Sequence, residues 1–174
     1  MNKLIPVFLF IILSPFLFTC YNGHGLSPFV SEMNGTGIKG HITFTGKWPD
    51  STKEVRVAVL DKYPEGISDP DSLMGFVLNN LIALSDTIPR FVNEYDYFIT
   101  AEEGFYEWVV VVWFPDIPLY LFGVRELGAY YSSTDDTKPC PVYISKGSVI
   151  SGIDITADFK NLENNAPFFK RNKK

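Results

Sequence analysis

Short runs of alternating apolar and polar residues, separated by turn residues, restrict the fold of this chain most strongly. Alternation with a period of two places every second side chain on one face of a strand, so each run predicts a half-buried β-strand. No window of helical length shows a convincing apolar period of 3.6 residues. We therefore predict an all-β fold, and the clearest runs direct these residues inward: Ile38, Gly40, Ile42, Phe44, Val55, Val57, Val59, Ile153, Ile155, Ala157 and Phe159.

Two longer apolar runs lie in the middle of the chain. Residues 95–100 and 105–114 are strand-like, and Gly104 in the connection favours a hairpin between them. Both faces of the second run are largely apolar. Such a strand belongs at the centre of a sheet that is covered on both sides, and we expect Trp108 to lie in the core.

The sequence makes more specific predictions for two aromatic residues of the second run. Tyr106 follows Gly104 by two residues. This placement resembles the tyrosine corner of β-sandwiches, in which the hydroxyl group bonds to upstream backbone. Trp113 lies on the face that also bears Glu107, so we expect an exposed aromatic there that could stack on a sugar ring or a partner chain.

The connection 62–81 is rich in Gly, Pro, Ser and Asp and predicts irregular structure. A short helix could form within 72–84, capped by Asp71 or Ser72. The cluster Asp69, Asp71 and Ser72 also permits a calcium hypothesis, but its spacing fits no EF-hand loop. We therefore expect ordinary turn and capping roles for these side chains and no bound metal.

The remaining segments complete the strand count. Residues 119–131 predict a hairpin or a packed loop, residues 132–139 a surface loop, and residues 142–144 a short strand. With the runs above, the chain has about seven strands separated by Gly and Pro turn signals. This pattern is typical of a single antiparallel β-sandwich.

Three segments carry a resemblance to a known family. They are Ile38-Lys39-Gly40-His41-Ile42-Thr43-Phe44 as first strand, Tyr97-Phe98-Ile99 leading to Gly104-Phe105-Tyr106, and Gly152-Ile153-Asp154-Ile155 as closing strand. They resemble the transthyretin-like (prealbumin-like) modules of bacterial surface proteins, akin to carboxypeptidase regulatory-like domains, over most of Gly37 to Phe159. The resemblance implies a seven-stranded sandwich that acts as a non-catalytic accessory, adhesion or ligand-presenting module. It transfers no catalytic residue.

The amino terminus has the order of an export signal. Lys3 precedes an unbroken apolar run over 4–18, which is shorter than the about 20 residues that a membrane-spanning helix needs. Leu17-Phe18-Thr19-Cys20 resembles the lipobox of bacterial lipoproteins, whose cysteine receives a lipid and becomes the first mature residue. We expect 1–19 to be a lipoprotein signal peptide and Cys20 to anchor the protein to a membrane. The alternative is an ordinary cleavage site with Cys20 nearby by chance.

The residues around the anchor refine this expectation. Tyr21 follows Cys20. In the sorting rule of some double-membrane bacteria an Asp at that position retains a lipoprotein at the inner membrane, so the outer membrane is favoured here by analogy. If Cys20 is acylated, Cys140 has no cysteine partner. A disulfide between the two stays open only if Cys20 carries no lipid.

The mature chain divides into three parts. Residues 20–36 predict a flexible tether, residues 37–160 one β-sandwich domain, and residues 161–174 a disordered basic tail. The acidic residues all lie between Glu32 and Glu163, where 10 Lys and Arg face 20 Asp and Glu, giving 10 − 20 = −10. Such a charge argues against nucleic acid as a partner. The basic tail could contact anionic lipid or glycan, although a frayed charged terminus is the simpler interpretation.

Catalytic equipment is not evident in the sequence. There is no Ser/His/Asp set in a nucleophile-elbow context, no phosphate-binding loop and no zinc-spaced cluster, and we expect no cofactor. A secreted enzyme is the third and weakest hypothesis. The first is a cell-envelope module that binds a partner protein through an edge strand or an aromatic patch. The second is a carbohydrate-binding module whose stacking residues would be Trp48, Trp113, Tyr120 and Tyr130.

Overall fold

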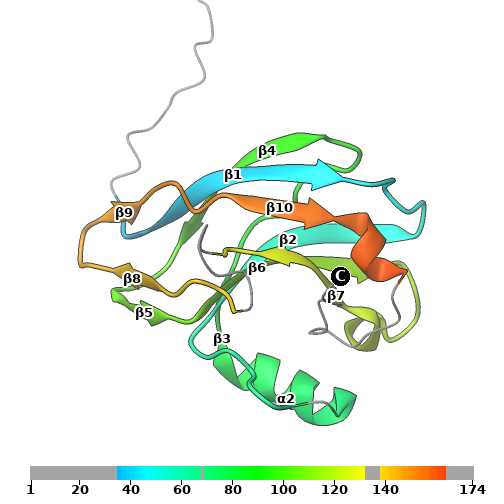
Figure 1. The fold of residues 1–174 in the computed structure, drawn as a ribbon, viewed down its shortest axis with the longest axis horizontal. Helices are drawn as coiled ribbons and strands as arrows, with labels where there is room; N and C mark the ends of the chain where they lie inside the picture. The colour runs from blue at the N-terminus through cyan, green and yellow to red at the C-terminus, as the bar shows by residue number, and fades with distance from the viewer. Residues whose placement is uncertain (1–34, 68, 132–137, 164–174) are drawn as a thin grey trace, which may run out of the picture. The chain divides into compact units, whose positions relative to one another are not determined.

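Ten β-strands, one α-helix and two short 3-10 helices make up the fold of the part of the chain that the computed structural model describes, residues 35–67, 69–131 and 138–163 (Figure 1). The predicted all-β class is therefore confirmed for these residues. The predicted signal peptide, the anchor Cys20, most of the tether and residues 164–174 of the predicted basic tail lie outside the described residues.

Eight of the strands form two four-stranded sheets. The first sheet has the order β10 (Ile155–Asp158), β1 (Gly37–Thr45) and β4 (Glu94–Thr100), with β9 (Val149–Ile150) also paired to β1. The second has the order β3 (Leu81–Leu84), β2 (Thr52–Leu60), β6 (Trp108–Pro115) and β7 (Arg125–Ala129). A separate ribbon joins β5 (Gly104–Tyr106) to β8 (Val142–Ile144).

The two four-stranded sheets enclose a common apolar core. Their inner faces contribute to a single cluster of buried residues, as expected for sheets that pack face to face. The predicted inward faces of the first, second and last runs are confirmed, because these cluster members are all buried: Ile38, Ile42, Phe44, Val55, Val57, Val59, Ile153, Ile155, Ala157 and Phe159.

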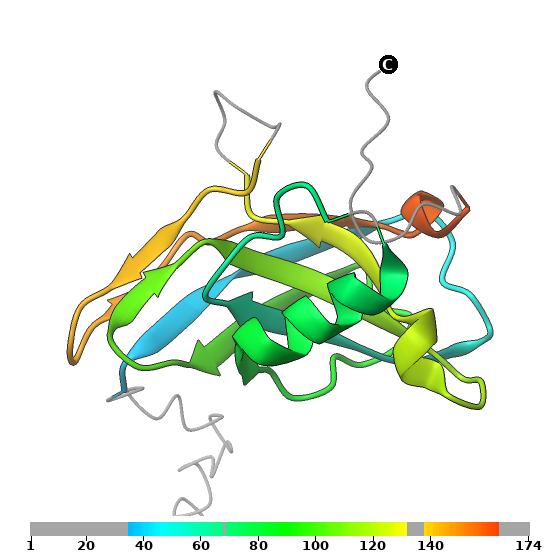
Figure 2. The same cartoon turned by 90° about the horizontal axis from the view of Figure 1, so that it is seen from below.

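A second apolar cluster lies on the outer face of the second sheet. All residues of β6 are buried, and β6 runs between β2 and β7, so the predicted central strand is confirmed. Trp108 is fully buried in this second cluster together with Leu73 from the helix α2 (Pro70–Asn80). Figure 2 shows α2 lying across this face of the sheet. The helix therefore covers the side of the sheet that would otherwise face water.

The strand pairing corrects two expectations. The described residues contain ten strands rather than about seven, because the sequence did not predict β3 or the two-residue strand β9, and because β5 and β6 were expected as one strand. The sheets are not purely antiparallel, since β1 pairs in parallel with β10 and β9. Before β9 the chain returns to the start of β1, where Gly37 N donates to Ser148 O at 3.1 Å. From that end β9 and then β10 follow β1 in the same direction.

The predicted hairpin between 95–100 and 105–114 is wrong. β4 pairs with β1 in the first sheet, whereas β6 pairs with β2 and β7 in the second. The second run is interrupted at Glu107, which separates β5 from β6. The chain around Gly104 therefore crosses from the first sheet to the second.

The helix forms, but at other bounds and with another cap than predicted. Asp69 is the cap, and its carboxylate accepts a hydrogen bond from Ser72 N at 2.8 Å. This bond also lowers the pKa of Asp69. The helix ends at Asn80, where the chain becomes extended and residues 81–84 enter the second sheet as β3. Asp69 therefore has the ordinary capping role that the sequence predicts for this cluster.

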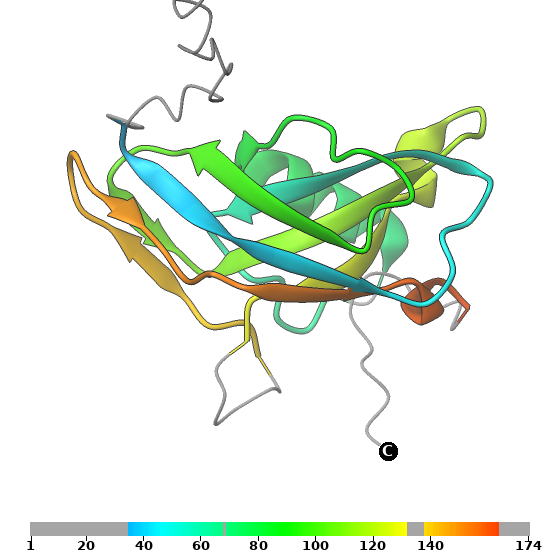
Figure 3. The same ribbon diagram turned by 90° about the horizontal axis from the view of Figure 1, so that it is seen from above.

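The two ends of the sheets differ in what they carry. The connections 46–51, 85–93 and 116–123 and the short helix η3 (Phe159–Leu162) gather at one end, which we call the loop end (Figure 3). The start of β1 lies at the opposite end. The predicted hairpin or packed loop at 119–131 is a 3-10 helix, η2 (Tyr120–Gly123), followed by β7.

Candidate functional site

Two of the four outer edges of the two four-stranded sheets are closed by contact with each other. β7 and β10 are edge strands of different sheets, and they approach so closely that a Cβ atom on Gly128 would lie 2.0 Å from Thr156 O. Asn161 adds to this closure, because its Nδ2 donates to Leu127 O at 2.8 Å. These two edges are therefore not open to another strand.

The third edge, β4, is protected by charge. Glu94 and Asp96 point outward, and their side chains are 70% and 90% exposed. Asp96 Oδ1 lies 2.7 Å from His41 Nδ1 on the neighbouring strand, a contact that raises the pKa of His41. His41 thus lies on the outward face, as the sequence predicts. Charged side chains on an edge strand discourage pairing with another chain.

The fourth edge, β3, has no such protection. Leu81, Ile82 and Leu84 are 36%, 48% and 42% exposed. Ala83 packs against the inter-sheet core. The strand contains neither a charged residue nor a proline. An exposed apolar edge strand is a template for pairing with another chain, and natural proteins usually blunt it.

Hydrogen bonds to the residue after β3 hold this edge in register with β2. Ser85 N donates to Val57 O at 2.8 Å, and Ser85 Oγ accepts from Val57 N at 2.9 Å. Arg56 Nη1 donates to Ser85 O at 2.8 Å and is itself held by Glu54. These bonds therefore hold the β3 edge in a defined position against β2.

The last turn of α2 extends the apolar surface of β3. Leu73 is buried under the helix, whereas Leu78, three residues before β3, is 57% exposed. We call the exposed set Leu78, Leu81, Ile82 and Leu84 the β3 surface. The expectation that a short helix extends through 81–84 is therefore wrong. The apolar run Leu81-Ile82-Ala83-Leu84 after Asn79-Asn80 is only a weak signal for a strand, because four residues do not distinguish a strand from the end of a helix.

The two predicted stacking tryptophans are buried. Trp48 is 7% exposed, and its ring lies 4.9 Å from that of Phe44 and 4.5 Å from that of Phe159. Trp113 is 9% exposed, and its Nε1 donates to Thr52 Oγ1 at 2.9 Å. The expectation that Trp113 is exposed is therefore wrong, because its face of β6 points into the inter-sheet core.

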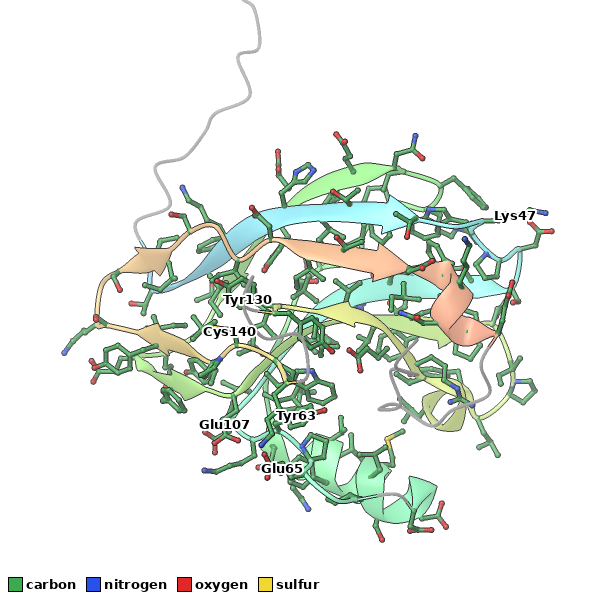
Figure 4. The ribbon with its side chains drawn as sticks, in the orientation of Figure 1. Lys47, Tyr63, Glu65, Glu107, Tyr130 and Cys140 are labelled. Atoms are coloured by element: carbon green, nitrogen blue, oxygen red, sulfur yellow. The ribbon has the colours of Figure 1, made fainter. Side chains whose placement is uncertain are left out.

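The two predicted tyrosines are half-buried and belong to different clusters. Tyr120 packs on the second cluster, and Lys53 Nζ lies 3.5 Å from the centre of its ring. Tyr130 packs on the inter-sheet core, and its carbonyl accepts from Cys140 N at 2.8 Å (Figure 4). The structure thus does not bring Trp48, Trp113, Tyr120 and Tyr130 together into one stacking surface.

Exposed aromatic residues occur instead on the β5–β8 ribbon. Phe105 and Tyr143 are directly opposite each other in this ribbon and are 53% and 64% exposed. Neither residue is among the stacking residues that the sequence predicts. The sequence signal for their exposure is weak, because both belong to strands of only three residues. Phe105 precedes the buried Tyr106, and Tyr143 lies between the buried residues Val142 and Ile144.

The segment that follows β2 is tied to the break between β5 and β6. Glu107 Oε2 accepts from Tyr63 N at 3.0 Å, and the Tyr63 ring meets the buried Trp108 edge-on at 5.8 Å (Figure 4). Burial raises the pKa of Tyr63, and nearby Glu126 and Glu65 add to that effect. The connection after β2 is therefore packed against the second apolar cluster through Tyr63.

Two further properties concern the described part of the chain. Within residues 35–67, 69–131 and 138–163, no group of three or more His, Cys, Asp or Glu side chains is arranged to hold a metal ion. No helix in the same ranges has both the length and the apolar character to cross a membrane. Cys140 is half-buried and forms no disulfide among these residues.

Comparison with known proteins does not assign the chain to a family. No family model matches it, and no curated protein or solved structure is found to be similar to it.

Proposed function

We propose that this chain is an exported, lipid-anchored, non-catalytic module of the bacterial cell envelope that binds a partner protein through its β3 surface. The supporting observation is the contrast among the sheet edges. β3 is apolar and exposed, whereas β7 and β10 close on each other and β4 carries outward acids. The partner's strand would extend the second sheet beyond β3.

The chemistry of such an addition divides into two parts. Backbone hydrogen bonds between β3 and the added strand supply affinity, and side chains at alternate positions supply specificity. Ile82, Leu84 and Leu78 would contribute apolar area, at about 25 cal/mol per Å² removed from water. A partner strand with β-branched or aromatic residues at matching positions fits this surface best.

The anchor and the family assignment rest on the sequence. Cys20 in its lipobox-like setting would hold the module at a membrane surface, with the outer membrane favoured by the residue Tyr21. A transthyretin-like type is supported by the two facing sheets, which contain eight of the ten described strands.

Affinity capture tests the proposal. The mature lipidated chain, purified from its native membrane after mild solubilisation, should retain one stable envelope protein. Ile82→Lys places a charge on the edge and should abolish this retention. Lys39→Ala, on the outward face of β1, is the matched surface control and should retain the protein. Equal retention by the Ile82→Lys chain would refute the role of β3.

Carbohydrate binding is the second candidate, and one observation favours it. The exposed pair Phe105 and Tyr143 presents two aromatic side chains side by side on the ribbon. Exposed aromatic faces can stack on sugar rings. A glycan array should show binding that Tyr143→Ala removes and Ile82→Lys leaves intact. Silence of the wild-type protein across broad glycan sets would exclude this candidate.

A further inference from the structure

The exposed apolar row of β3 ends beside an acidic residue. Ile82, Leu84 and Asp86 are exposed at a spacing of two, whereas Ala83 is half-buried and Ser85 is buried between them. The exposure therefore alternates past the end of β3, as it does along a strand with one open face. A carboxylate thus continues the row of exposed apolar side chains.

The charge of Asp86 is not neutralised by another described residue. Among residues 35–67, 69–131 and 138–163, its carboxylate forms no ion pair. Arg56 lies at this end of β3, where its Nη1 donates to Ser85 O. Its Nε and Nη2 both donate to Glu54 Oε2, at 2.9 and 2.8 Å. Glu54 thus compensates Arg56, and the negative charge of Asp86 remains available to a partner.

The other end of β3 is also acidic. Asp61 N donates to Asn80 O at 3.0 Å, so Asp61 lies beside the residue that precedes β3. Lys62 follows it, but Lys62 Nζ lies 4.0 Å from Glu107 Oε1 and is compensated by that carboxylate. The uncharged strand β3 therefore lies between two acidic residues, of which Asp86 is exposed and Asp61 is half-buried.

These charges argue against a second copy of the chain as the partner. The described residues contain 10 Lys and Arg and 17 Asp and Glu, giving 10 − 17 = −7, so two copies repel each other. Antiparallel pairing of two β3 strands about their centre would also bring Asp86 of one copy to the Asn80 end of the other, where Asp61 lies. Like charges that face each other across an interface suppress binding. The edge therefore suits a different chain better than a second copy.

We infer that the partner at β3 is a different protein, whose added strand carries apolar residues flanked by Lys or Arg. This inference rests on the proposed function and names the chemistry of its partner. The apolar residues would cover Ile82 and Leu84, and the cation would meet Asp86 beyond Ser85.

The charge contact would also fix the register of the added strand. Leu81, Ile82 and Leu84 offer similar apolar contacts in more than one register, so apolar burial alone specifies the alignment weakly. A cation placed against Asp86 distinguishes these registers. Electrostatic complementarity of this kind contributes to partner choice and register more than to affinity.

Three synthetic peptides test the inference by fluorescence anisotropy. They share one core of alternating Val and Thr and carry Lys, Gln or Glu at both ends. The protein is the mature chain from residue 20 with Cys20→Ser, so that no attached lipid contributes. The Lys peptide should bind about twofold to fivefold more tightly than the Gln peptide, as expected for one exposed ion pair. The Glu peptide should bind most weakly, and added salt should reduce these differences.

Two charge variants locate the effect. Asp86→Lys should reverse the order, so that the Glu peptide binds most tightly. Glu103→Lys makes the same change in net charge at an exposed position between β4 and β5, and it should keep the original order. The same order of affinities in Asp86→Lys and in the parent chain would overturn the inference.

Ile82→Lys separates the inference from the proposed function. If Ile82→Lys removes binding of all three peptides while Asp86→Lys leaves their order unchanged, β3 remains the binding edge and only the charge inference is overturned. If Ile82→Lys binds all three peptides as well as the parent chain does, the proposed role of β3 fails. Failure of the parent chain to bind any peptide would overturn the inference. Self-association that sedimentation velocity detects in the parent chain and not in Ile82→Lys would overturn it in favour of a second copy.

Discussion

Ser85 and Val57 exchange two hydrogen bonds at the end of β3: Ser85 N donates to Val57 O at 2.8 Å, and Ser85 Oγ accepts from Val57 N at 2.9 Å. In the second bond, a side-chain hydroxyl rather than a backbone carbonyl accepts from the buried backbone donor Val57 N. Ser85 is only 7% exposed and Val57 is fully buried, so the bond lies in the protein interior. This pair therefore fixes the register of the edge that we propose as the binding surface.

Removing this hydroxyl should weaken both stability and edge order. Ser85→Ala leaves Val57 N without its acceptor, which should cost about 1–3 kcal/mol in the free energy of unfolding. Urea denaturation measures this cost. Ser151→Ala, at an exposed position, is the control and should change the free energy of unfolding by less than about 0.5 kcal/mol. Equal stability of the two variants would contradict the role of Ser85.

The predicted tyrosine corner is present and can be tested separately. Tyr106 Oη donates to Glu102 O at 2.9 Å, and burial raises the pKa of Tyr106. Tyr106→Phe should cost about 1 kcal/mol by thermal or chemical denaturation, since one hydrogen bond is lost and the packing is kept. Tyr143→Phe removes an exposed hydroxyl and should have almost no effect. Similar losses in both variants would show that the corner bond does not matter.

Closure of the β7 and β10 edges predicts a strong effect at one glycine. Gly128→Ala would place Cβ 2.0 Å from Thr156 O, a backbone atom that cannot move without shifting β10. We expect a loss of about 3 kcal/mol or more. Gly75→Ala, in α2 with nothing within 4 Å of the added carbon, should instead gain about 0.5–1 kcal/mol. Denaturation curves of both variants test the sign in each case.

The outward face of the first sheet should show a small pH dependence. The hydrogen bond that the His41 ring donates to Asp96 raises the pKa of His41 most, and the charges of Asp96, Glu94 and Asp154 contribute further. A histidine whose pKa is raised by folding stabilises the protein below its unfolded pKa of about 6.5. This stabilisation is lost as the pH rises through the higher folded value. NMR titration of His41 should therefore show a raised pKa, and Asp96→Asn should bring it back toward the ordinary value. An unchanged pKa in Asp96→Asn would contradict this assignment.

Alternation predicted the inner faces of the core well. Val55, Val57 and Val59 lie inward because a strand with one polar face has only one way to bury its apolar side chains. The same rule predicted β10. It failed for Trp113, because Glu107 on the same apparent face belongs to a break before β6 and the periodicity restarts there.

Local signals could not predict the pairing of strands or the β3 surface. Gly104 marks a turn in the chain but does not determine which sheet receives the next strand. Leu81–Leu84 is too short to distinguish a strand from the end of a helix by period alone. Trp48 follows a strand in a turn-rich segment, and its burial depends on Phe44 and Phe159 from distant parts of the sequence. These features are decided by tertiary contacts.

Site-specific photocrosslinking in intact cells tests the central proposal most directly. A photoreactive amino acid at position 82, on β3, should produce one discrete adduct with an envelope protein. The same group at position 96, on the charged edge β4, should produce none. No adduct at position 82, or equal adducts at both positions, would contradict the proposal that β3 is the surface that binds the partner.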